Sequence, residues 1–293
     1  MQTQQDLKKK IENTEDLEAV VKTMKVLAAV SIRQFQRAVE SLSDYRRTVD
    51  MGFQILLRQR PHVLSEIGSA QDGGVGAVVF GSHQGMCGQF NEQLADFIVQ
   101  KMQDLGAGGD QRRVLAIGER IISRLENRGQ NVDAALVAAD SVVGIVPLLR
   151  EVVIRIERWR SEHRLGRMVV FNNQPTSGSS YRPRMVQLLP LDREWFRSLQ
   201  GQDWPSVCFP NYKGHWPDVF SSLVRQFFFV VLYRGAAESL ASENAARLAA
   251  MQVAEKNIDE RLDELTAQYN HQRQSSITAE LLDIVSGFEA LVD

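Results

Sequence analysis

The stretch "FGSHQGMCGQFN", residues 80–91, combines glycines, a histidine and a cysteine between a predicted strand and a predicted helix. Phosphate-binding loops occupy that position. However, its glycines lack the dinucleotide spacing, no Gly-Lys-Ser/Thr follows, and His83 stands where a nucleophile elbow needs serine. Cys87, near the expected helix start, is a candidate for a lowered pKa, but no histidine and asparagine pattern supports a thiol enzyme. We interpret the stretch as a tight structural turn and expect no cofactor.

An arginine-rich stretch, "REVVIRIERWRSEHRLGR" at residues 150–167, contains six arginines and a tryptophan, a composition that suits an RNA surface. Glu151 and Arg155, and likewise Arg158 and Glu162, lie four residues apart and are expected to pair along one helix face. The whole chain has a net charge of -2 and a pI near 6.3. We therefore predict a solvated helix face and no nucleic-acid partner.

Metal, disulfide and membrane signals are weak. The five histidines form no i,i+4 ligand pair, and Cys87 and Cys208 are too few and too far apart for a zinc site or a disulfide framework. The first ten residues lack the apolar core of a signal peptide, and the longest apolar run, Phe227 to Tyr233, is far shorter than the about 20 residues that span a membrane. We expect a cytosolic chain that holds no metal and does not itself cross a membrane.

Two long runs, Met1 to Met51 and Ala236 to Ser286, contain neither glycine nor proline, and each is 51 residues long. As a continuous helix, each would measure roughly 77 Å at about 1.5 Å per residue. A compact globule of this chain length is only about 50 Å across. Both helices are therefore too long to be enclosed in one globule.

Apolar residues in these runs follow the coiled-coil period. In the first run the average step is 3.5 residues over Val21, Met24, Ala28, Ile32, Phe35, Val39, Leu42, Tyr45, Val49, Phe53 and Leu56. In the last run the pattern comprises Leu248, Met251, Ile258, Leu262, Leu265 and Tyr269, then a polar gap at Gln272 to Ser276, then Ile277, Leu281, Ile284, Phe288 and Leu291. Each helix thus carries an apolar stripe that needs a partner.

The charges favour pairing of the two ends. Residues 1–60 carry 11 Lys or Arg against 8 Asp or Glu, whereas residues 236–293 carry 4 against 11. Opposite signs favour association, although each exposed pair contributes only a fraction of a kcal/mol, so the apolar seam supplies most of the stability. We predict an intramolecular antiparallel coiled coil. The alternative is two amphipathic helices packed on an ordinary domain.

The middle of the chain alternates short apolar strands with helices. The strands are expected at residues 76–80, 113–117, 168–171 and 185–189, and the helices at residues 91–105, 119–128 and 146–163. This alternation predicts a small Rossmann-like α/β domain with a largely parallel sheet. We therefore divide the chain into an N-terminal helix at 1–60, an α/β domain at 61–215 and a C-terminal helix at 216–293. Within the domain, the segment 172–183 is predicted to be an exposed, mobile loop.

The segment "ASENAARLAAM", Ala241 to Met251, combines small residues with hydrogen-bonding groups. Small side chains allow another backbone to approach closely, and Glu243, Asn244 and Arg247 are candidates to bind a partner, because arginine grips a carboxylate or carbonyl with a fixed fork. The alternative is a tight helix–helix crossing within the coiled coil.

Four segments together resemble the gamma subunit, or central rotor stalk, of rotary F-type ATP synthases. They are "SENAARLAAMQVAEKN" at 242–257, "YNHQRQSSITAELLDIVSG" at 269–287, "IENTEDLEAVVKTMKVLAA" at 11–29 and "GMCGQFN" at 85–91. The resemblance spans nearly the whole chain. His83-Gln84 and Gln89 depart from the family's usual loop, and the middle domain is the least typical region, which suits a divergent bacterial branch.

The resemblance implies a coiled coil inside a ring of alternating alpha and beta subunits, with the α/β domain beside the epsilon subunit and the membrane c-ring. The apolar end of the chain would then turn in a hydrophobic sleeve of the ring, through Ile277, Leu281, Ile284, Phe288 and Leu291. Polar ring contacts carried over from the family fall on Arg247, Gln274, Thr278 and Glu280, with Asn270 and Arg273 as further candidates and Met24 and Lys25 on the N-terminal helix.

The implied mechanism is mechanical. Ion flow through the c-ring turns the asymmetric stalk, which biases each beta subunit among nucleotide-affinity states. The chain itself would be non-catalytic, need no cofactor and lie peripherally on the cytoplasmic side of the bacterial inner membrane. Two other classes stay open from the residues alone: a coiled-coil tether carrying a small-molecule-binding α/β domain, and a homodimeric scaffold.

Overall fold

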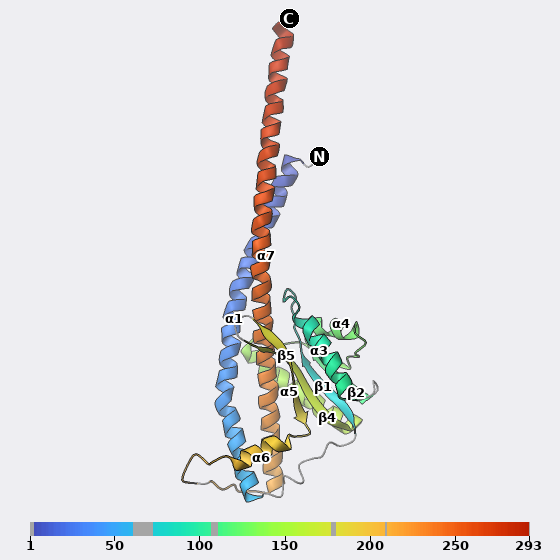
Figure 1. Cartoon of the computed structure of the whole chain (residues 1–293), viewed down its shortest axis with the longest axis vertical. Helices are drawn as coiled ribbons and strands as arrows, with labels where there is room; N and C mark the ends of the chain where they lie inside the picture. The colour runs from blue at the N-terminus through green and yellow to red at the C-terminus, as the bar shows by residue number, and fades with distance from the viewer. Residues whose placement is uncertain (1–2, 61–72, 107–110, 177–179, 209, 293) are drawn as a thin grey trace. The chain divides into compact units, whose positions relative to one another are not determined.

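The computed structural model describes residues 3–60, 73–106, 111–176, 180–208 and 210–292, with the side chains of 287–292 excluded. The chain forms two compact units, one of residues 1–28 and 248–293 and the other of residues 29–247. Two long helices contribute to both units: α1, Gln4–Gln59, with 56 residues, and α7, Trp216–Val292, with 77 residues (Figure 1). The division into segments at residues 60 and 215 stays a prediction.

Both long helices exceed the glycine-free runs that predicted them. α1 continues through Gly52, and α7 continues through Gly235. α7 begins at Trp216 as expected, with Pro217 in the first turn, where no intrahelical N–H bond is lost. A helix tolerates a single glycine where packing compensates for it, so the glycine-free criterion underestimates the helix length.

The smaller unit pairs the start of α1 with the C-terminal part of α7 in antiparallel orientation. Val21 and Met24 pack in one apolar cluster with Met251 and Ile258. Beside the cluster, Lys25 Nζ lies 2.5 Å from Glu255 Oε2. The predicted coiled coil is confirmed, with opposite charges flanking an apolar seam.

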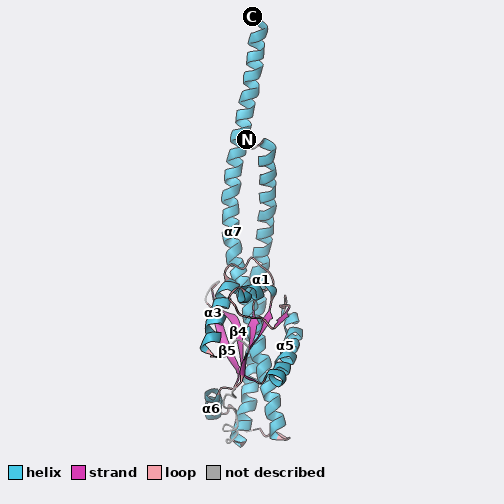
Figure 2. Ribbon diagram, turned by 90° about the vertical axis from the view of Figure 1, so that its right-hand side faces the viewer, coloured by secondary structure: helices cyan, strands magenta, loops and turns pink. Residues whose placement is uncertain are grey.

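The same pair sets the register of the two helices. Because Lys25 lies opposite Glu255 and both helices rise equally per residue, Gln4 lies opposite about residue 276. Both views show α7 continuing past the start of α1 (Figures 1 and 2). The last turns of α7 therefore have no partner among the residues of α1 that the structure describes.

The larger unit is built on a five-stranded sheet in the order β3-β2-β1-β4-β5. The pairs β1–β2, β2–β3 and β1–β4 are parallel, and β4–β5 is antiparallel. The strands are β1 Gly74–Phe80, β2 Arg112–Ile117, β3 Ala134–Leu136, β4 Leu165–Pro175 and β5 Tyr181–Leu189; the shorter helices are α3 Phe90–Asp104, α4 Glu119–Glu126, α5 Val142–His163 and α6 Arg193–Gly201. The expected α/β domain with a largely parallel sheet is confirmed.

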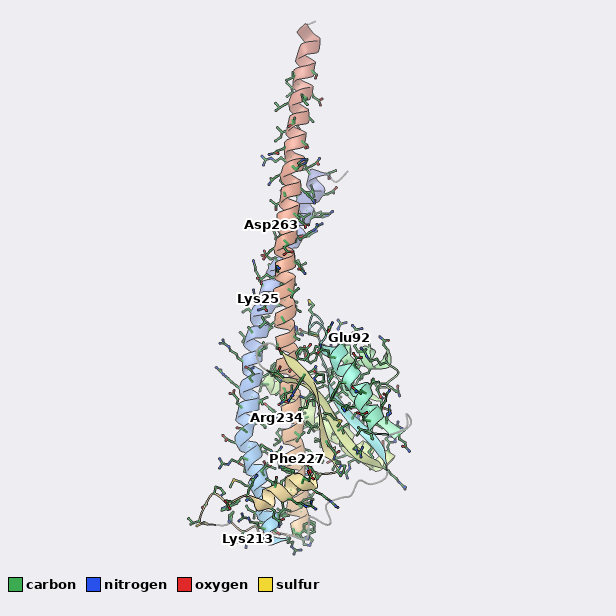
Figure 3. The ribbon with its side chains drawn as sticks, viewed as in Figure 1. Lys25, Glu92, Lys213, Phe227, Arg234 and Asp263 are labelled. Carbon is green, nitrogen blue, oxygen red and sulfur yellow. The ribbon has the colours of Figure 1, made fainter. Side chains whose placement is uncertain are left out.

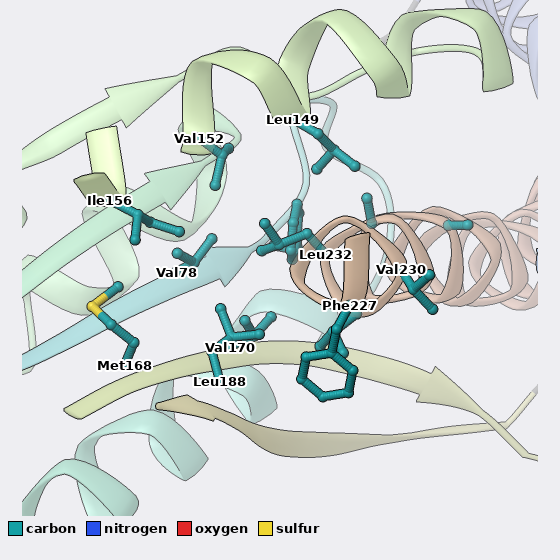
Figure 4. Close-up of a cluster of buried hydrophobic side chains, with 14 of the residues drawn as sticks. Val78, Leu149, Val152, Ile156, Met168, Val170, Leu188, Phe227, Val230 and Leu232 are labelled. Carbon is teal, nitrogen blue, oxygen red and sulfur yellow. The ribbon is translucent and has the colours of Figure 1, made fainter. Parts of the chain in front are cut away.

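Successive side chains of a strand point to opposite faces of the sheet, so alternate residues of the central strands belong to two separate cores. One core lies between the sheet and helices α1, α5, α6 and α7, and the other between the sheet and helices α3 and α4. Figure 4 shows the first core, where side chains of the sheet and of α5 meet those of α7. The labelled members include Val78, Val170, Leu149, Val152, Phe227 and Leu232. Part of α7 is thus a core helix of the α/β unit.

The sequence prediction missed two elements and misassigned one. β3 has only three residues at the sheet edge, and α6 has nine residues, so neither gives a sustained periodic signal. The segment 172–183 is not a loop throughout, because β4 extends to Pro175 and β5 begins at Tyr181. Asn172 and Asn173 are fully buried in β4, so the expectation of exposure was wrong for them.

α7 also satisfies, on length and composition alone, the criterion for a membrane span. Among the residues described, it contains an 18-residue window with a mean hydropathy of 1.2. This is weak evidence, because a core helix of a soluble protein passes the same test. The residues from Phe227 to Ala246 contribute many side chains to the cores of the α/β unit, so this apolar stretch has a partner within the protein.

Gly118, which follows β2, occupies a position that only glycine suits. Its φ of 98° lies in the left-handed region, and an added Cβ would lie 2.6 Å from the carbonyl oxygen of Ser82. We expect Gly118→Ala to lower the free energy of unfolding by about 1–3 kcal/mol, measured by urea unfolding with tryptophan fluorescence. Gly201→Ala is the matched control, since an added Cβ there meets no atom within 4 Å. Equal effects of the two substitutions would contradict the assignment of strain to Gly118.

Candidate functional site

The loop after β1 is a closed hydrogen-bonded turn. The backbone N–H of Ser82 donates to Asn91 Oδ1 at 3.1 Å, and Asn91 Nδ2 donates to Ser82 Oγ at 2.8 Å. The Ser82 hydroxyl donates in turn to the carbonyl oxygen of Gln84 at 2.9 Å. Gly88 has a φ of 56° near the start of α3. The predicted tight turn is confirmed, and its polar groups satisfy one another.

Cys87 in this turn is buried, and its Sγ lies 3.6 Å from Ser82 Oγ. Burial raises the pKa of the Cys87 thiol, with Glu243 acting in the same direction and the Ser82 hydrogen bond and Arg247 opposing it. The lowered pKa for which Cys87 was a candidate is therefore wrong, because loss of solvent is the largest influence on this thiol. A thiol in this environment stays protonated and unreactive.

The two cysteines are consequently expected to differ in reactivity. Cys208 is exposed, whereas Cys87 is buried in the turn. In the folded chain we expect iodoacetamide to modify Cys87 slower than Cys208 by about two orders of magnitude or more, as measured by peptide mass spectrometry. In urea, which exposes both thiols, the two rates should converge. Comparable rates in the folded chain would show that the turn opens readily.

The small residues of α7 let the helix approach this turn and the neighbouring strands. Ala246 packs in one cluster with Cys87 and Phe90. Two serine hydroxyls donate to backbone carbonyls: Ser239 to Phe80 at 2.7 Å, and Ser242 to Asn173 at 3.2 Å. The segment at 241–251 was expected to face either a partner protein or the other long helix. Instead, its first half docks on the α/β part of its own chain.

Arg247 and Glu243 form a buried ion pair on α7. Arg247 Nη2 lies 2.6 Å from Glu243 Oε1, and Arg247 Nη1 donates to Asn244 Oδ1 at 3.1 Å. Arg247 is 7% exposed and Glu243 6% exposed, and Arg247 Nε has no hydrogen-bond partner among the residues that the structure describes. Burial raises the pKa of the Glu243 carboxyl, and the charge and hydrogen bond of Arg247 offset part of that rise. The three polar groups expected to bind a partner are thus occupied within the helix.

A second buried carboxylate, Glu238, was not found from the sequence. Arg234 Nε lies 2.7 Å and Arg184 Nη1 3.4 Å from its oxygens, and Asn172 Nδ2 donates to Oε2 at 3.1 Å. Figure 3 labels Arg234 on α7. Asn172 continues the inward-facing alternation of β4, and that period of two was the available signal. The run "NNQP", residues 172–175, was instead assigned to the loop on the composition of its polar residues.

The predicted contact residues of the smaller unit divide into two groups. Met24 is half-buried in the seam, and Lys25 is committed to its pair with Glu255. Exposed side chains on α7 form the other group: Asn270, Arg273, Gln274, Thr278 and Glu280. Of these, Thr278 Oγ1 donates to the carbonyl oxygen of Gln274 at 2.9 Å within the helix. The structure brings the N-terminal pair against α7 and leaves the exposed group facing solvent.

Apolar side chains at the end of α7 are also exposed. Ile277, Leu281 and Ile284 are 46%, 57% and 69% exposed, and Leu282 and Val285 are similarly uncovered. The side chains of Phe288 and Leu291, predicted for the same stripe, lie outside the described residues. An exposed apolar surface at the end of a helix is typical of a binding site for another molecule.

The arginine-rich helix α5 has the solvated face that was predicted, but not its ion pairs. Trp159 is buried in the core rather than facing outward. Within the described part of the chain, neither Glu151 with Arg155 nor Arg158 with Glu162 is among the ion pairs. Exposed side chains of this length gain little from fixed pairing, because the loss of rotamer freedom offsets the attraction.

Comparison with known proteins decides the family. The family model described as ATP synthase matches residues 3–291 of this chain, which include both long helices and the sheet. The chain belongs to the ATP synthase gamma-subunit family. The gamma chain is therefore a central stalk subunit, and catalysis in this family lies in the beta subunits. The tether and scaffold alternatives are not favoured.

Solved structures show the same fold at low sequence identity. A chain of the Euglena gracilis mitochondrial ATP synthase, in the OSCP/F1/c-ring structure, matches with a TM-score of 0.63 at 17% identity, covering 98% of the gamma chain and 94% of the other. A chain of the Tetrahymena thermophila mitochondrial ATP synthase, in the central stalk and c-ring structure, matches with a TM-score of 0.58 at 19% identity, covering 80% and 99%. The gamma chain is thus similar in fold to these rotor chains, over nearly its full length in the first case and over four fifths of it in the second.

Proposed function

We propose that the uncovered end of α7 is the part of the gamma chain that turns inside the alpha/beta ring. The observation that carries this proposal is the exposed apolar stripe beyond the start of α1, at Ile277, Leu281 and Ile284. A rotating terminus benefits from apolar contacts, which are non-directional, since fixed hydrogen bonds would impose discrete stops. Phe288 and Leu291 continue the same stripe in sequence and complete the proposed bearing.

Polar contacts to the ring are proposed for the exposed group on α7. Gln274, Thr278 and Glu280 are the main candidates, with Asn270 and Arg273 beside them, and their exposure leaves them available. Met24 and Lys25, at the edge of the seam, would add contacts to the ring from the N-terminal helix. Arg247 is proposed on family grounds only, because its guanidinium would have to leave Glu243 to reach a ring subunit.

The remaining partners follow from the stalk role. The Euglena and Tetrahymena structures combine the rotor with a c-ring, and the former includes the F1 sector. We propose that the α/β part of the gamma chain contacts the c-ring and the epsilon subunit, and that ion flow through the c-ring turns it. The gamma chain would itself catalyse no reaction, bind no cofactor, and lie peripherally on the cytoplasmic side of a bacterial inner membrane.

A tagged pull-down from the native membrane fraction tests this function. We expect two larger nucleotide-binding subunits in about threefold molar excess over the gamma chain, with ATPase activity in the eluate. Mass spectrometry gives the stoichiometry, and the same sample reports whether epsilon and c subunits accompany them. Recovery of the gamma chain alone or as a homodimer would count against the stalk assignment.

The bearing itself has a sharper test. Because Leu281 and Ile284 are exposed in the chain, replacing both by aspartate should change the free energy of unfolding of the isolated chain by less than about 0.5 kcal/mol. The same double variant should recover about tenfold less alpha and beta subunit in the pull-down, because the charges would be buried in an apolar sleeve.

Leu265→Asp is the matched control for that variant. Leu265 is buried in the seam, so a carboxylate there should destabilise the isolated chain itself. If the Leu281/Ile284 double variant recovered as much alpha and beta subunit as the wild-type chain, these two side chains would not be part of the bearing.

A further inference from the structure

A cavity of about 860 Å³ lies within the larger unit, walled by α1, β4, β5, α6 and α7. This volume is in the range of small-molecule pockets, about 300–1,000 Å³. The stalk role uses none of its residues. Its wall combines a charged group on the sheet side with an apolar and aromatic surface, the combination that binds amphipathic ligands.

The charged group consists of Glu238 between Arg184 and Arg234, all three lining the cavity. Glu238 is buried, whereas the side chains of Arg184 and Arg234 are 35% and 50% exposed. One carboxylate neutralises only one of the two guanidiniums, so the group keeps a net charge of +1. Each guanidinium has five N–H donors, and a single shared carboxylate leaves several of them available.

The other charged groups of the wall, Arg46, Asp192 and Glu40, sum to a charge of -1, so the wall as a whole is neutral and the positive charge is local to Arg184 and Arg234. Arg46 is paired with Asp50, with Nε 2.7 Å from Oδ1. Asp192 Oδ1 accepts the backbone N–H of Glu194 at 2.8 Å and caps α6. Glu40 lines the cavity from α1 as an exposed residue. The two arginines around Glu238 are therefore the group suited to receive an anion.

Aromatic rings form a flat part of the apolar wall. Trp195 and Phe227 stack with their centroids 4.8 Å apart and their planes at 29°. Arg46 covers both rings, with its Cζ 5.0 Å from the Trp195 centroid and 4.9 Å from that of Phe227. Figures 3 and 4 place Phe227 on α7, and Figure 4 shows it near Leu188 of the sheet. Both rings also line the cavity, and the parts that Arg46 leaves uncovered present a rigid apolar surface to an alkyl chain or a ring.

We propose that this cavity binds an amphipathic anion, with a carboxylate or phosphate head on Arg184 and Arg234 and an apolar tail along Trp195 and Phe227. Planar guanidiniums bind both head groups in a forked geometry. Transfer of the apolar tail from water into the cavity supplies the affinity, and the charged head group fixes the orientation of the ligand. A ligand seated there contacts α1, α7 and the sheet together, so its binding stabilises their packing.

Calorimetric titration of the isolated full-length chain tests the proposal with defined probes. Decanoate and decyl phosphate, below their micelle concentrations, are expected to bind with a 1:1 stoichiometry. 1-Decanol, which lacks the charge, and inorganic phosphate, which lacks the tail, are each expected to bind more weakly by about tenfold or more. Binding of decanol as tight as decanoate, or of phosphate alone as tight as decyl phosphate, would overturn the assigned ligand class.

Two variants locate the site. Arg184→Gln should weaken decanoate binding by about tenfold, whereas Arg158→Gln, the same change on the solvated face of α5, should leave it unchanged. Val186→Trp, which fills the cavity from β5, should abolish binding in a chain that melts as a folded protein. Equal effects of the two glutamine substitutions, or full binding by a folded Val186→Trp chain, would place the anion elsewhere. Because these experiments use the isolated chain, an absence of ligand binding would not affect the pull-down test of the stalk role.

Discussion

Replacing Leu262 by proline is expected to uncouple ATP hydrolysis from ion pumping in the assembled complex. Leu262 is half-buried in α7, where it packs on the cluster of Val21, Met251 and Ile258. Proline removes one backbone hydrogen bond and clashes with the preceding turn, which costs about 3 kcal/mol or more in a helix interior. The torque of a stalk passes along a continuous helix, so a kink at this level interrupts it.

The measurement compares two activities in inverted membrane vesicles. ATP hydrolysis should continue in the Leu262→Pro complex, because the catalytic sites lie in the beta subunits. ATP-driven ion uptake, followed with both proton- and sodium-sensitive probes, should fall to the background of vesicles without ATP. Leu262→Ala is the control, since alanine removes the same packing but keeps the helix. Wild-type uptake per ATP in the proline variant would contradict torque transmission through this part of α7.

Breaking the buried pair of Arg247 and Glu243 is expected to give the largest loss of stability in the isolated chain. Glu243→Ala leaves the guanidinium of Arg247 buried without its partner, which typically costs about 3–5 kcal/mol. Urea unfolding followed by tryptophan fluorescence measures the change. Replacing both residues together, Glu243→Leu with Arg247→Met, should restore most of the loss, because an apolar pair leaves no buried charge.

The same experiment separates two roles for Arg247. A cost below about 1 kcal/mol for Glu243→Ala would mean that the pair does little for the fold, and the family-based ring contact would then be the better explanation of Arg247. A large cost that the double replacement repairs would mean that Arg247 serves mainly to neutralise the buried carboxylate of Glu243 within α7.

The pair also predicts a pH dependence. Because burial raises the pKa of Glu243 above its ordinary value of 4.5, the folded chain binds this proton more tightly than the unfolded chain. The contribution of the protonated carboxyl to stability is therefore complete below pH 4.5 and is lost as the pH rises through the folded pKa. Glu243→Gln, which cannot titrate, should lack this decline. Parallel stability profiles of the two chains across that range would show that the Glu243 pKa is not raised.

The long helices, their seam and the identity of the central strands could be predicted from the sequence. These features depend on residue spacing along the chain: a period of 3.5 for Val21 to Leu56, and short apolar runs for β1, β2 and β4. The apolar period of Ile277, Leu281 and Ile284 was also visible in the sequence, whereas its exposure beyond the start of α1 followed from the register of the two helices in the structure. Short elements without a sustained period, β3 and α6, were not predicted.

Which polar groups face inward could not be predicted from the sequence and is seen only in the folded chain. Arg247, Glu243 and Glu238 carry the same charges in the sequence whether they meet a partner protein or their own chain. Their burial follows from α7 docking on the loop after β1 and on β4, contacts that join residues up to 159 positions apart. The cavity by Glu238 likewise depends on five elements meeting in space. Local spacing encodes the period of an element, but the environment of a charge depends on distant residues, which no short motif specifies.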